Sequence, residues 1–337
     1  MASLKVFAFD YATAGGPLPR AMPRALARQQ AVLLDALLAD LAALPEVTLC
    51  TMAGDDTAVS AHASFRQRFA AGVQAADAVW PLATESARLL EGLSRDILDG
   101  KRILLGSAPG AVRVAASKLK VARALADAGV PVVPTFSPHA ALPDLDGAWV
   151  VKPDDGAGCL DTRLFGDRAA ALAWLRASGA QGYVLQPFVP GRLGSLSLVC
   201  CDGTARVLAC NLERVAMRDN HFHFLGSTVN GLDDGNGELA RLGQAVAAAL
   251  PTLWGYVGVD FILADSGPVV LDVNPRLTVA YAGLHASIGC NPAGIVIDLL
   301  RGPAAMPTPP GRRRVVSVDL GSTDLGGFGL GAQGSAD

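Results

Sequence analysis

The predicted pattern of strands and helices changes part-way along the chain, and this change limits the fold classes that are compatible with the sequence. Over residues 1–105, apolar strands alternate with helical segments, beginning with a strand at 4–9 that ends at Asp10. This alternation predicts a doubly wound parallel sheet. From residue 183 onward, strands such as YVLQPFV, GSLSLVCC and VGVDFILA follow one another and alternate in polarity, which predicts an antiparallel sheet. We therefore expect an α/β (α+β) protein.

The amino-acid composition and the net charge limit the classes of protein to which the chain can belong. Of 337 residues 51% are apolar, enough for two or three packed layers. The formal net charge is −3 and the sequence pI is about 6.0, so no basic field predicts a nucleic-acid partner. Six cysteines without a CxxC pair indicate reduced thiols. The N-terminal residues do not form a signal-peptide pattern, and no apolar run approaches the ~18 residues of a membrane span. We expect a cytoplasmic protein without a membrane partner.

One helix is well delimited and begins with two basic residues. Ser117 is its predicted N-cap, Gly129 its C′ residue and Pro131 its stop signal. Lys118 and Lys120 lie in its first turn, where the helix dipole disfavours cations. A nearby anion would explain this placement, although exposed lysines also tolerate it.

A second lysine precedes a glycine-rich segment. Lys152 ends the strand WVVK and is followed by DDGAGC. Glycines there would let backbone N–H groups approach a phosphate, but turns also use glycine. The P-loop pattern GxxxxGK[ST] is absent, and Gly15–Gly16 do not complete a GxGxxG fingerprint. The first absence argues against a P-loop, and the second argues against a nicotinamide-binding Rossmann site.

The segment GVDFILADSGPVVLDVN predicts a β-hairpin with a charged pair of residues. A loop over 265–267 would pair Ala264 with Pro268 and place Asp260 directly opposite Asp272. Opposed carboxylates are about 4.5–5.5 Å apart at Cβ and repel each other. A ligand that relieves this repulsion would explain the pair.

The same register makes one hairpin face polar and the other apolar. Gly258 would lie opposite Asn274 on the polar face. Two carboxylates and an amide make an oxygen-only site of the kind Mg²⁺ prefers when it shares phosphate oxygens. A solvent-exposed face with scattered polar residues is the alternative. The residues expected in the core are Val259, Phe261, Leu271 and Val273.

In their order along the chain, these features resemble the ATP-grasp superfamily. Its pattern joins a lysine at a helix start, a lysine at a strand end, a glycine-rich loop, an adenine-binding hinge and an acid…acid-x-Asn metal site. The matching stretches are SKLK, VVKP, DGAGC, LQPFVPG, GVDF and LDVNPR. The resemblance implies an N-terminal pre-ATP-grasp domain at 1–105, a lid subdomain at 106–182, a catalytic subdomain at 183–301, and a terminal strand with a flexible tail at 302–337.

The resemblance also implies how a nucleotide is bound. The two lysines would hold the ATP phosphates while the glycine-rich loop closes over them. One backbone carbonyl and one N–H of the hinge would border the adenine. The residues implied to bind ATP are Lys118, Lys152, Gly156, Gly158, Gln186 and Val189.

The metal and catalytic residues follow from the same resemblance. Asp260, Asp272 and Asn274 would bind one or two Mg²⁺ ions, with Asp272 as the bridging ligand and Mn²⁺ able to substitute. Arg276, together with Lys152, would steady the transferring phosphoryl group. The implied reaction is attack of a carboxylate on the γ-phosphate of ATP, followed by capture of the acyl phosphate by an amine.

Two further stretches, NPRLTVAYAGL and FAFDYATAGG, resemble the tyramine–L-glutamate ligases of methanofuran-type (methylofuran-type) cofactor biosynthesis. This narrower resemblance implies L-glutamate as the phosphorylated acid and tyramine or tyrosine as the aromatic amine. Thr278, Tyr281 and the Gly15–Gly16 loop would border the acceptor pocket. Thr278 and Tyr281 would otherwise simply pack the start of a helix.

Departures from the family pattern keep alternatives open. Asp272 replaces the usual glutamate, Gln186 stands where an acid is common, and Gly258 stands where some dipeptide ligases carry arginine. A peptide ligase with another acceptor, an ATP-binding module without ligase chemistry, and a phosphotransferase are the alternatives. Either a monomer or a homodimer is compatible with the sequence.

Three other features have weaker interpretations. The HFHF segment at 221–224 is better explained as a strand with two polar positions than as a metal pair. Cys159 has no evident base for nucleophilic catalysis. Glu213, Arg214 and Arg218 suit either a glutamate substrate or a solvated strand edge.

Overall fold

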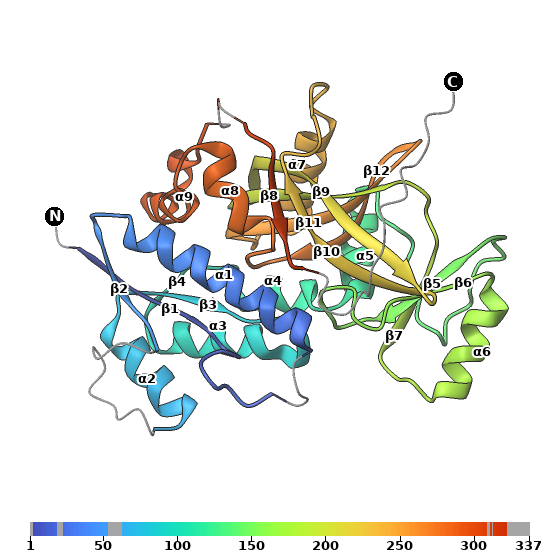
Figure 1. Ribbon diagram of the computed structural model, residues 1–337, viewed down its shortest axis with the longest axis horizontal. Coiled ribbons are helices and arrows are strands. Elements are labelled where there is room, and N and C mark those ends of the chain that lie inside the picture. The colour runs from blue at the N-terminus through green and yellow to red at the C-terminus, as the bar shows by residue number, and fades with distance from the viewer. Residues whose placement is uncertain (1–2, 19–22, 53–62, 309–310, 312, 322–337) are drawn as a thin grey trace.

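The computed structural model describes residues 3–18, 23–52, 63–308, 311 and 313–321, and it contains two sheets (Figure 1). The tail that the sequence predicts to be flexible lies, from residue 322, outside the described residues. The first sheet is parallel, in the order β2–β1–β3–β4. Its strands are β1 (Leu4–Asp10), β2 (Val47–Cys50), β3 (Ala78–Leu82) and β4 (Ile103–Leu104).

Helices cover both faces of this parallel sheet because side chains along β1 alternate. Val6 and Ala8 pack with apolar residues of helix α1 (Arg24–Ala42). Phe7 and Phe9 pack on the other face with helices α2 (Phe65–Ala75) and α3 (Leu89–Asp99). In Figure 1 α1 lies above the sheet and α2 and α3 lie below it. The doubly wound arrangement predicted for residues 1–105 is confirmed.

The second sheet is antiparallel and runs in the order β12–β11–β8–β9–β10–β6–β5–β7, with β13 paired to β10. It is continuous across the predicted boundary at residue 182, because β7 pairs with β5 and β6 pairs with β10. Its strands are β5 (Trp149–Pro153), β6 (Arg163–Phe165), β7 (Tyr183–Pro187), β8 (Arg192–Cys201), β9 (Thr204–Arg218), β10 (His221–Val229), β11 (Gly255–Ala264), β12 (Gly267–Asn274) and β13 (Val316–Asp319).

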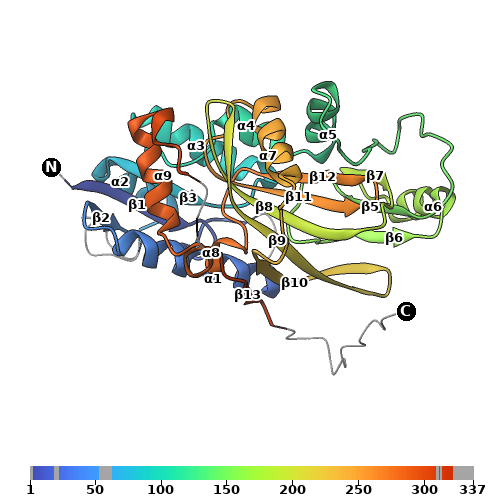
Figure 2. The same ribbon diagram turned by 90° about the horizontal axis from the view of Figure 1, so that it is seen from above.

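The remaining helices pack around this second sheet. Figure 2 shows α6 beside the small group of strands β5–β7, at the end of the molecule away from the parallel sheet. Helix α7 packs on β8, β9 and β12. These helices are α4 (Pro109–Ala115), α5 (Lys118–Asp127), α6 (Arg168–Ser178), α7 (Glu238–Ala249), α8 (Tyr281–Ile288) and α9 (Pro292–Asp298).

The two sheets are joined by a polar contact between α1 and α8. Asp40, 6% exposed, accepts a hydrogen bond of 2.9 Å from the Tyr281 hydroxyl, and its other oxygen lies 2.6 Å from His285 Nδ1. Because a buried carboxylate needs polar partners, this contact helps to hold α1 against α8.

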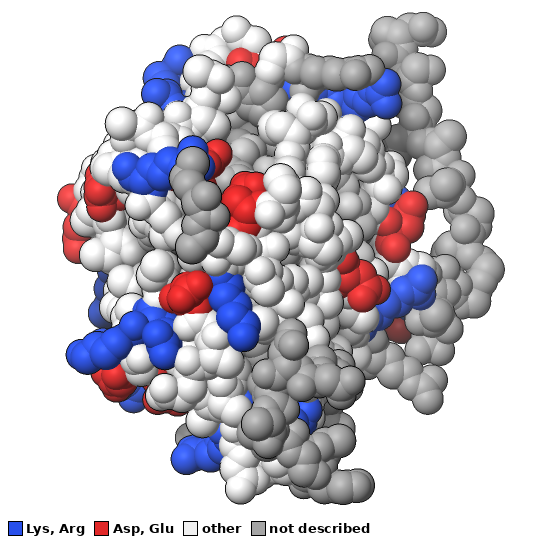
Figure 3. All heavy atoms as spheres, turned by 90° about the vertical axis from the view of Figure 1, so that its left-hand side faces the viewer, with Lys and Arg blue, Asp and Glu red and all other residues white. Residues whose placement is uncertain are grey.

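The surface and the helices show two further properties. The end of the molecule in Figure 3 carries acidic and basic side chains interspersed among uncharged residues. Within the described ranges, no helix combines the length and apolarity required to cross a bilayer.

Candidate active site

The β11–β12 hairpin brings Asp260 opposite Asp272, as the sequence predicts, but through a different register. The turn contains two residues rather than three, so Ala264 pairs with Gly267. A β-bulge then inserts Leu271, because Phe261 pairs with Val270 while Asp260 pairs with Asp272. The shorter turn and the extra residue compensate for each other, so Asp260 still lies opposite Asp272. The predicted pairing of Gly258 with Asn274 is confirmed as well.

Because of the bulge, the predicted core position of Leu271 is wrong. We expected this side chain in the core beside Phe261, which is fully buried. Leu271 instead lines a cavity together with Asp272. An extra residue interrupts the two-residue alternation of a strand, so Leu271 does not share a face with Val273.

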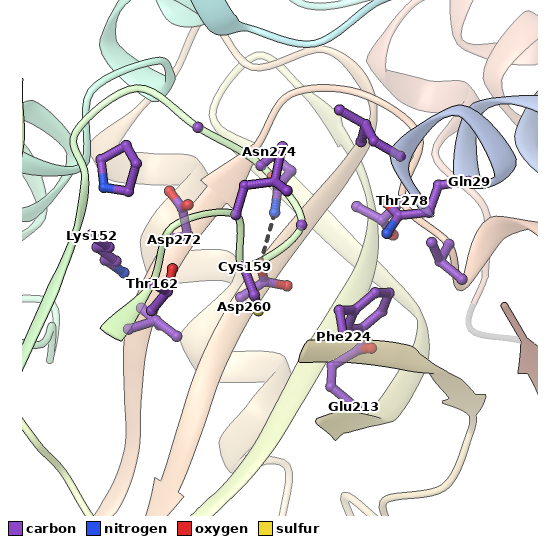
Figure 4. A pocket seen from close by; sticks show the side chains of 18 of the residues that line it. Gln29, Lys152, Cys159, Thr162, Glu213, Phe224, Asp260, Asp272, Asn274 and Thr278 are labelled. Atoms are coloured by element: carbon purple, nitrogen blue, oxygen red, sulfur yellow. Dashed lines mark hydrogen bonds between the residues drawn. The ribbon is translucent and has the colours of Figure 1, made fainter. Parts of the chain in front are cut away.

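The cavity has a volume of about 160 Å³ and lies between the second sheet and helix α1. Leu26, Gln29, Gln30 and Leu33 of α1 line it. Their spacing is that of one helix face, so the N-terminal domain supplies one wall. Figure 4 shows Gln29 and Thr278 at one side of this cavity and Lys152 and Asp272 at the other.

Helix α5 presents Lys118 to the cavity, and its N-cap is tied to the end of β5. The predicted cap is confirmed, since Ser117 Oγ accepts from Lys120 N at 3.2 Å. Asp154 accepts from Ser117 Oγ at 2.7 Å and from Leu119 N at 2.9 Å. This double contact holds the helix start against the glycine-rich segment.

The Lys118 ammonium has two anionic or polar neighbours. It donates to the Gly156 carbonyl at 2.8 Å and lies 3.3 Å from Asp272 Oδ2. The anion expected near this helix start is therefore, in part, a carboxylate of the predicted metal site. Gly158 lines the cavity with a φ of 67°, and a Cβ there would lie 3.5 Å from Gln29 Nε2.

Lys152 is 6% exposed and lines the same cavity. Burial, followed by repulsion from Lys118, lowers the pKa of Lys152 to about 8. Among the described residues its ammonium forms no hydrogen bond or ion pair. The charges of Asp272 and Asp260 oppose this lowering, but neither carboxylate pairs directly with Lys152. A buried cation without a direct partner is costly, so this position favours an anionic ligand.

The opposed carboxylates of Asp260 and Asp272 place two negative charges close together in the same cavity. Burial, followed by repulsion from Asp272, raises the pKa of Asp260 to about 6. Asn274 Nδ2 donates to Asp260 Oδ2 at 3.0 Å, and Asn274 Oδ1 accepts from Arg276 at 3.3 Å. The donor set fits a hard cation that takes further ligands from phosphate or water. In the described part of the chain, no group of three or more His, Cys, Asp or Glu residues could hold a metal alone.

Arg276 pairs with Glu85, a residue that the sequence did not point to. Its Nε lies 2.8 Å from Glu85 Oε2, and both side chains are nearly buried. Glu85 precedes Ala87 and Arg88, whose φ angles of 54° and 59° are unusual for residues other than glycine. Ala87 N donates to Asp155 Oδ2 at 2.7 Å. This strained turn thus connects the N-terminal domain to both Arg276 and the glycine-rich segment.

Glu213 was predicted only as one of two possibilities, and the structure places it in the cavity lining. Its Oε1 accepts from Ser195 Oγ and, at 3.1 Å, from Ser227 Oγ. Burial, followed by Asp260, raises the pKa of Glu213 to about 7. The two arginines that were predicted together with Glu213 form ion pairs of their own. Arg214 pairs with Asp319, and Arg218 pairs with Asp219.

Several predicted residues lie away from this cavity. Gln186 and Val189 are not in its lining, and the Gln186 side chain donates to Thr135 Oγ1 at 2.7 Å. Gly15 and Gly16 follow β1 and do not line it either. The roles proposed for these hinge and loop residues remain predictions.

Of the two residues expected at the acceptor pocket, Thr278 lines the cavity and Tyr281 does not. Thr278 lines the cavity and exchanges a hydrogen bond of 2.9 Å with the Tyr256 hydroxyl. Tyr281 is 1% exposed, does not line the cavity and donates to Asp40. A Cβ at Gly258 would lie 2.4 Å from Thr278 Cγ2, so no arginine fits there in this packing.

The other weakly interpreted residues have structural explanations. His221 and His223 lie on β10, where His221 Nδ1 contacts the Asp219 carbonyl at 2.8 Å. Burial, followed by Asp260, raises the pKa of the Cys159 thiol to about 11, which disfavours the thiolate.

The chain belongs to the ATP-grasp superfamily. A family model described as an ATP-grasp domain matches residues 115–280, and one described as a pre ATP-grasp 3 domain matches residues 28–112. No curated protein matches the chain in sequence.

Solved structures share the fold at low sequence identity. An ATP-grasp superfamily protein from Archaeoglobus fulgidus is 21% identical with a TM-score of 0.66, covering 93% of this chain and 91% of that one. The L-amino acid ligase from Bacillus licheniformis is 16% identical with a TM-score of 0.61, covering 92% and 76%. The D-alanine–D-alanine ligase from Bacillus anthracis is 12% identical with a TM-score of 0.63, covering 89% and 96%.

Proposed function

We propose that the protein is an ATP-dependent carboxylate–amine ligase that joins the side-chain carboxylate of L-glutamate to an aromatic amine, tyramine or tyrosine. The observation that carries the ATP-dependent step is the charge imbalance in one cavity. Lys152 is a buried cation that no described residue pairs with directly, although Asp272 and Asp260 attract it, and these two carboxylates oppose each other in the same lining. The triphosphate of ATP with Mg²⁺ supplies the opposite charge to each.

The residues are suited to phosphoryl transfer by position and charge. Lys118 and Lys152 would bind phosphate oxygens, and the loop containing Gly156 and Gly158 would cover them. Asp260, Asp272 and Asn274 would hold Mg²⁺, which neutralises charge on the phosphates when it is bound. Arg276, oriented by Glu85, would face the transferring group.

The reaction proceeds in two steps. A carboxylate oxygen of glutamate attacks the γ-phosphorus of ATP, an O–P bond forms, and ADP leaves. The ammonium form of the acceptor first releases a proton, and the neutral amine nitrogen then attacks the acyl carbon. A C–N bond forms, the bond from the acyl carbon to the phosphate oxygen breaks, and inorganic phosphate and a second proton are released. Positioning and charge stabilisation account for catalysis of this kind.

Two observations support an amino-acid-type acid and an apolar amine. Two of the similar structures are named as ligases of amino acids, the L-amino acid ligase and the D-alanine–D-alanine ligase. The cavity wall on α1 includes Leu26 and Leu33, which suits an apolar substrate body. The stretch NPRLTVAYAGL supports the narrower assignment to methylofuran-type cofactor biosynthesis.

The test measures ADP release with Mg·ATP and L-glutamate, with tyramine, with tyrosine, and without an amine, and identifies products by mass spectrometry. Lys152→Met and Asp272→Ala are the variants, and Lys101→Met, a lysine on the exposed surface, is the matched control. We expect amine-dependent ADP and a γ-glutamyl adduct from wild type and Lys101→Met only. ATP binding without turnover across a wider panel of acids and amines would refute the ligase assignment.

A further inference from the structure

The Glu213 carboxylate has one oxygen that is fully engaged and one that is not. Oε1 accepts hydrogen bonds from Ser195 and Ser227, and Ser195 is itself held by Asn211 Nδ2 at 3.1 Å. Oε2 is buried and has no hydrogen-bond partner among the residues that the structure describes. Because the serines fix the plane of the carboxylate, the free oxygen has a set direction. A buried carboxylate oxygen without a donor is destabilising, and a cationic ligand would offset this cost.

The position of Glu213 separates it from the phosphate-binding lysines. In Figure 4, Asp260 lies between Glu213 on one side and Lys152 with Asp272 on the other. Lys118 already contacts Asp272, so the two lysines belong to the opposite side of the cavity. Glu213 is therefore on the side of the cavity away from the two lysines.

Part of the cavity wall beside Glu213 is apolar. Strands β9 and β10 pair Ser227 with Glu213 and Val215 with Phe224, so Glu213 and Phe224 lie along the same paired strands. Figure 4 shows the Phe224 ring next to Glu213. Leu193 also lines the cavity. An anion next to an apolar part of the wall matches a ligand with one cationic group on an apolar body.

We propose that Glu213 binds the ammonium group of the acceptor amine through Oε2, while Phe224 and Leu193 contact its apolar body. This inference rests on the proposed ligase function and deepens it, because it assigns the amine subsite and requires an acceptor that arrives as an alkylammonium ion. The serine pair would act as positioning residues for the carboxylate.

A metal-binding role is the principal rival for Glu213. Among the described residues, no cluster of three or more His, Cys, Asp or Glu residues could hold a metal ion. Glu213 therefore does not join Asp260 and Asp272 in one acidic cluster, although all three line the cavity. The two serine hydroxyls also occupy Oε1, so only Oε2 is left for a ligand.

The experiment compares a cationic acceptor with an uncharged one in the same enzyme. Hydroxylamine is largely uncharged at neutral pH and captures acyl phosphates as hydroxamates. Wild type should form both γ-glutamyl tyramine and glutamyl hydroxamate. In Glu213→Gln we expect the ratio of kcat/KM for tyramine to that for hydroxylamine to fall about 30-fold, as for loss of a charged hydrogen bond. Glu46→Gln, at an exposed glutamate, is the control and should keep the wild-type ratio.

The outcomes separate this inference from the proposed function. No hydroxamate and no tyramine adduct from wild type would refute the ligase itself. Hydroxamate formation with an unchanged ratio in Glu213→Gln would overturn the amine subsite alone. Equal loss of both products, with a raised Mg²⁺ requirement, would assign Glu213 to the metal and overturn the inference as well.

A second measurement does not depend on the variant folding. Tyramine and its uncharged alcohol analogue tyrosol are compared as ligands of wild type in the presence of Mg·ATP. We expect tyramine to bind at least about 10-fold more tightly. Equal affinity for the two compounds would overturn the proposal.

Discussion

Removing the charge of Asp260 is expected to stabilise the ligand-free protein while abolishing its activity. Burial and the opposed Asp272 raise the pKa of Asp260 from 3.8 to about 6. A tenfold change in proton affinity corresponds to about 1.4 kcal/mol, so holding Asp260 ionised at neutral pH costs up to about 3 kcal/mol. Asp260→Asn removes this cost, because asparagine has no charge and still accepts the hydrogen bond from Asn274.

The predicted change in melting temperature follows from the size of the chain. An unfolding entropy of about 2.1 cal/mol/K per residue gives about 0.7 kcal/mol/K for this chain, so 3 kcal/mol corresponds to about 4 °C. The gain should depend on pH. An acid with a raised folded-state pKa binds its proton more tightly in the folded state, so wild type loses stability as the pH rises from about 4 to 6. The variant lacks that loss.

The assay is thermal unfolding in EDTA at pH 4.5 and pH 7.5, then with Mg·ATP at pH 7.5. We expect Asp260→Asn to melt above wild type at pH 7.5, to match it more closely at pH 4.5, and to gain less from Mg·ATP. Asp272→Asn is the matched control, since it also removes the partner of Lys118 and should gain less than Asp260→Asn. A variant that melts at or below wild type at pH 7.5 would refute the repulsion argument.

Three other substitutions probe separate parts of the site. Lys152→Met should weaken ATP binding at least about 10-fold in calorimetry, because it removes a buried cation facing the phosphates; unchanged affinity would contradict that role. Gly158→Ala should lower the free energy of unfolding by about 1 kcal/mol and raise the KM for ATP, because alanine is strained at a φ of 67°; unaltered denaturation curves and KM would count against a closing loop. Glu85→Gln should lower kcat about 100-fold with little change in the KM for ATP, because Arg276 loses its buried charged partner; a wild-type kcat would show that Arg276 needs no orientation.

The sequence alone determined those parts of the site that depend on neighbours in the chain. A hairpin turn and the alternation of strand side chains are local, so the opposition of Asp260 and Asp272 could be predicted even though the loop length was wrong. The bulge at Leu271 compensated for that error. The N-cap at Ser117 and the helical start at Lys118 were predictable for the same reason.

Only the tertiary structure decided which distant residues complete the cavity. Glu85, beside the strained turn before α3, pairs with Arg276, which follows β12, and no periodicity in the sequence encodes that contact. Tyr281 was expected at a substrate pocket, but its hydroxyl is buried against Asp40. A periodic pattern reveals which face of an element is apolar. The partner that covers this face depends on the packing of one sheet against the other, and this packing placed α1 as the wall of the cavity and isolated the free oxygen of Glu213 within it.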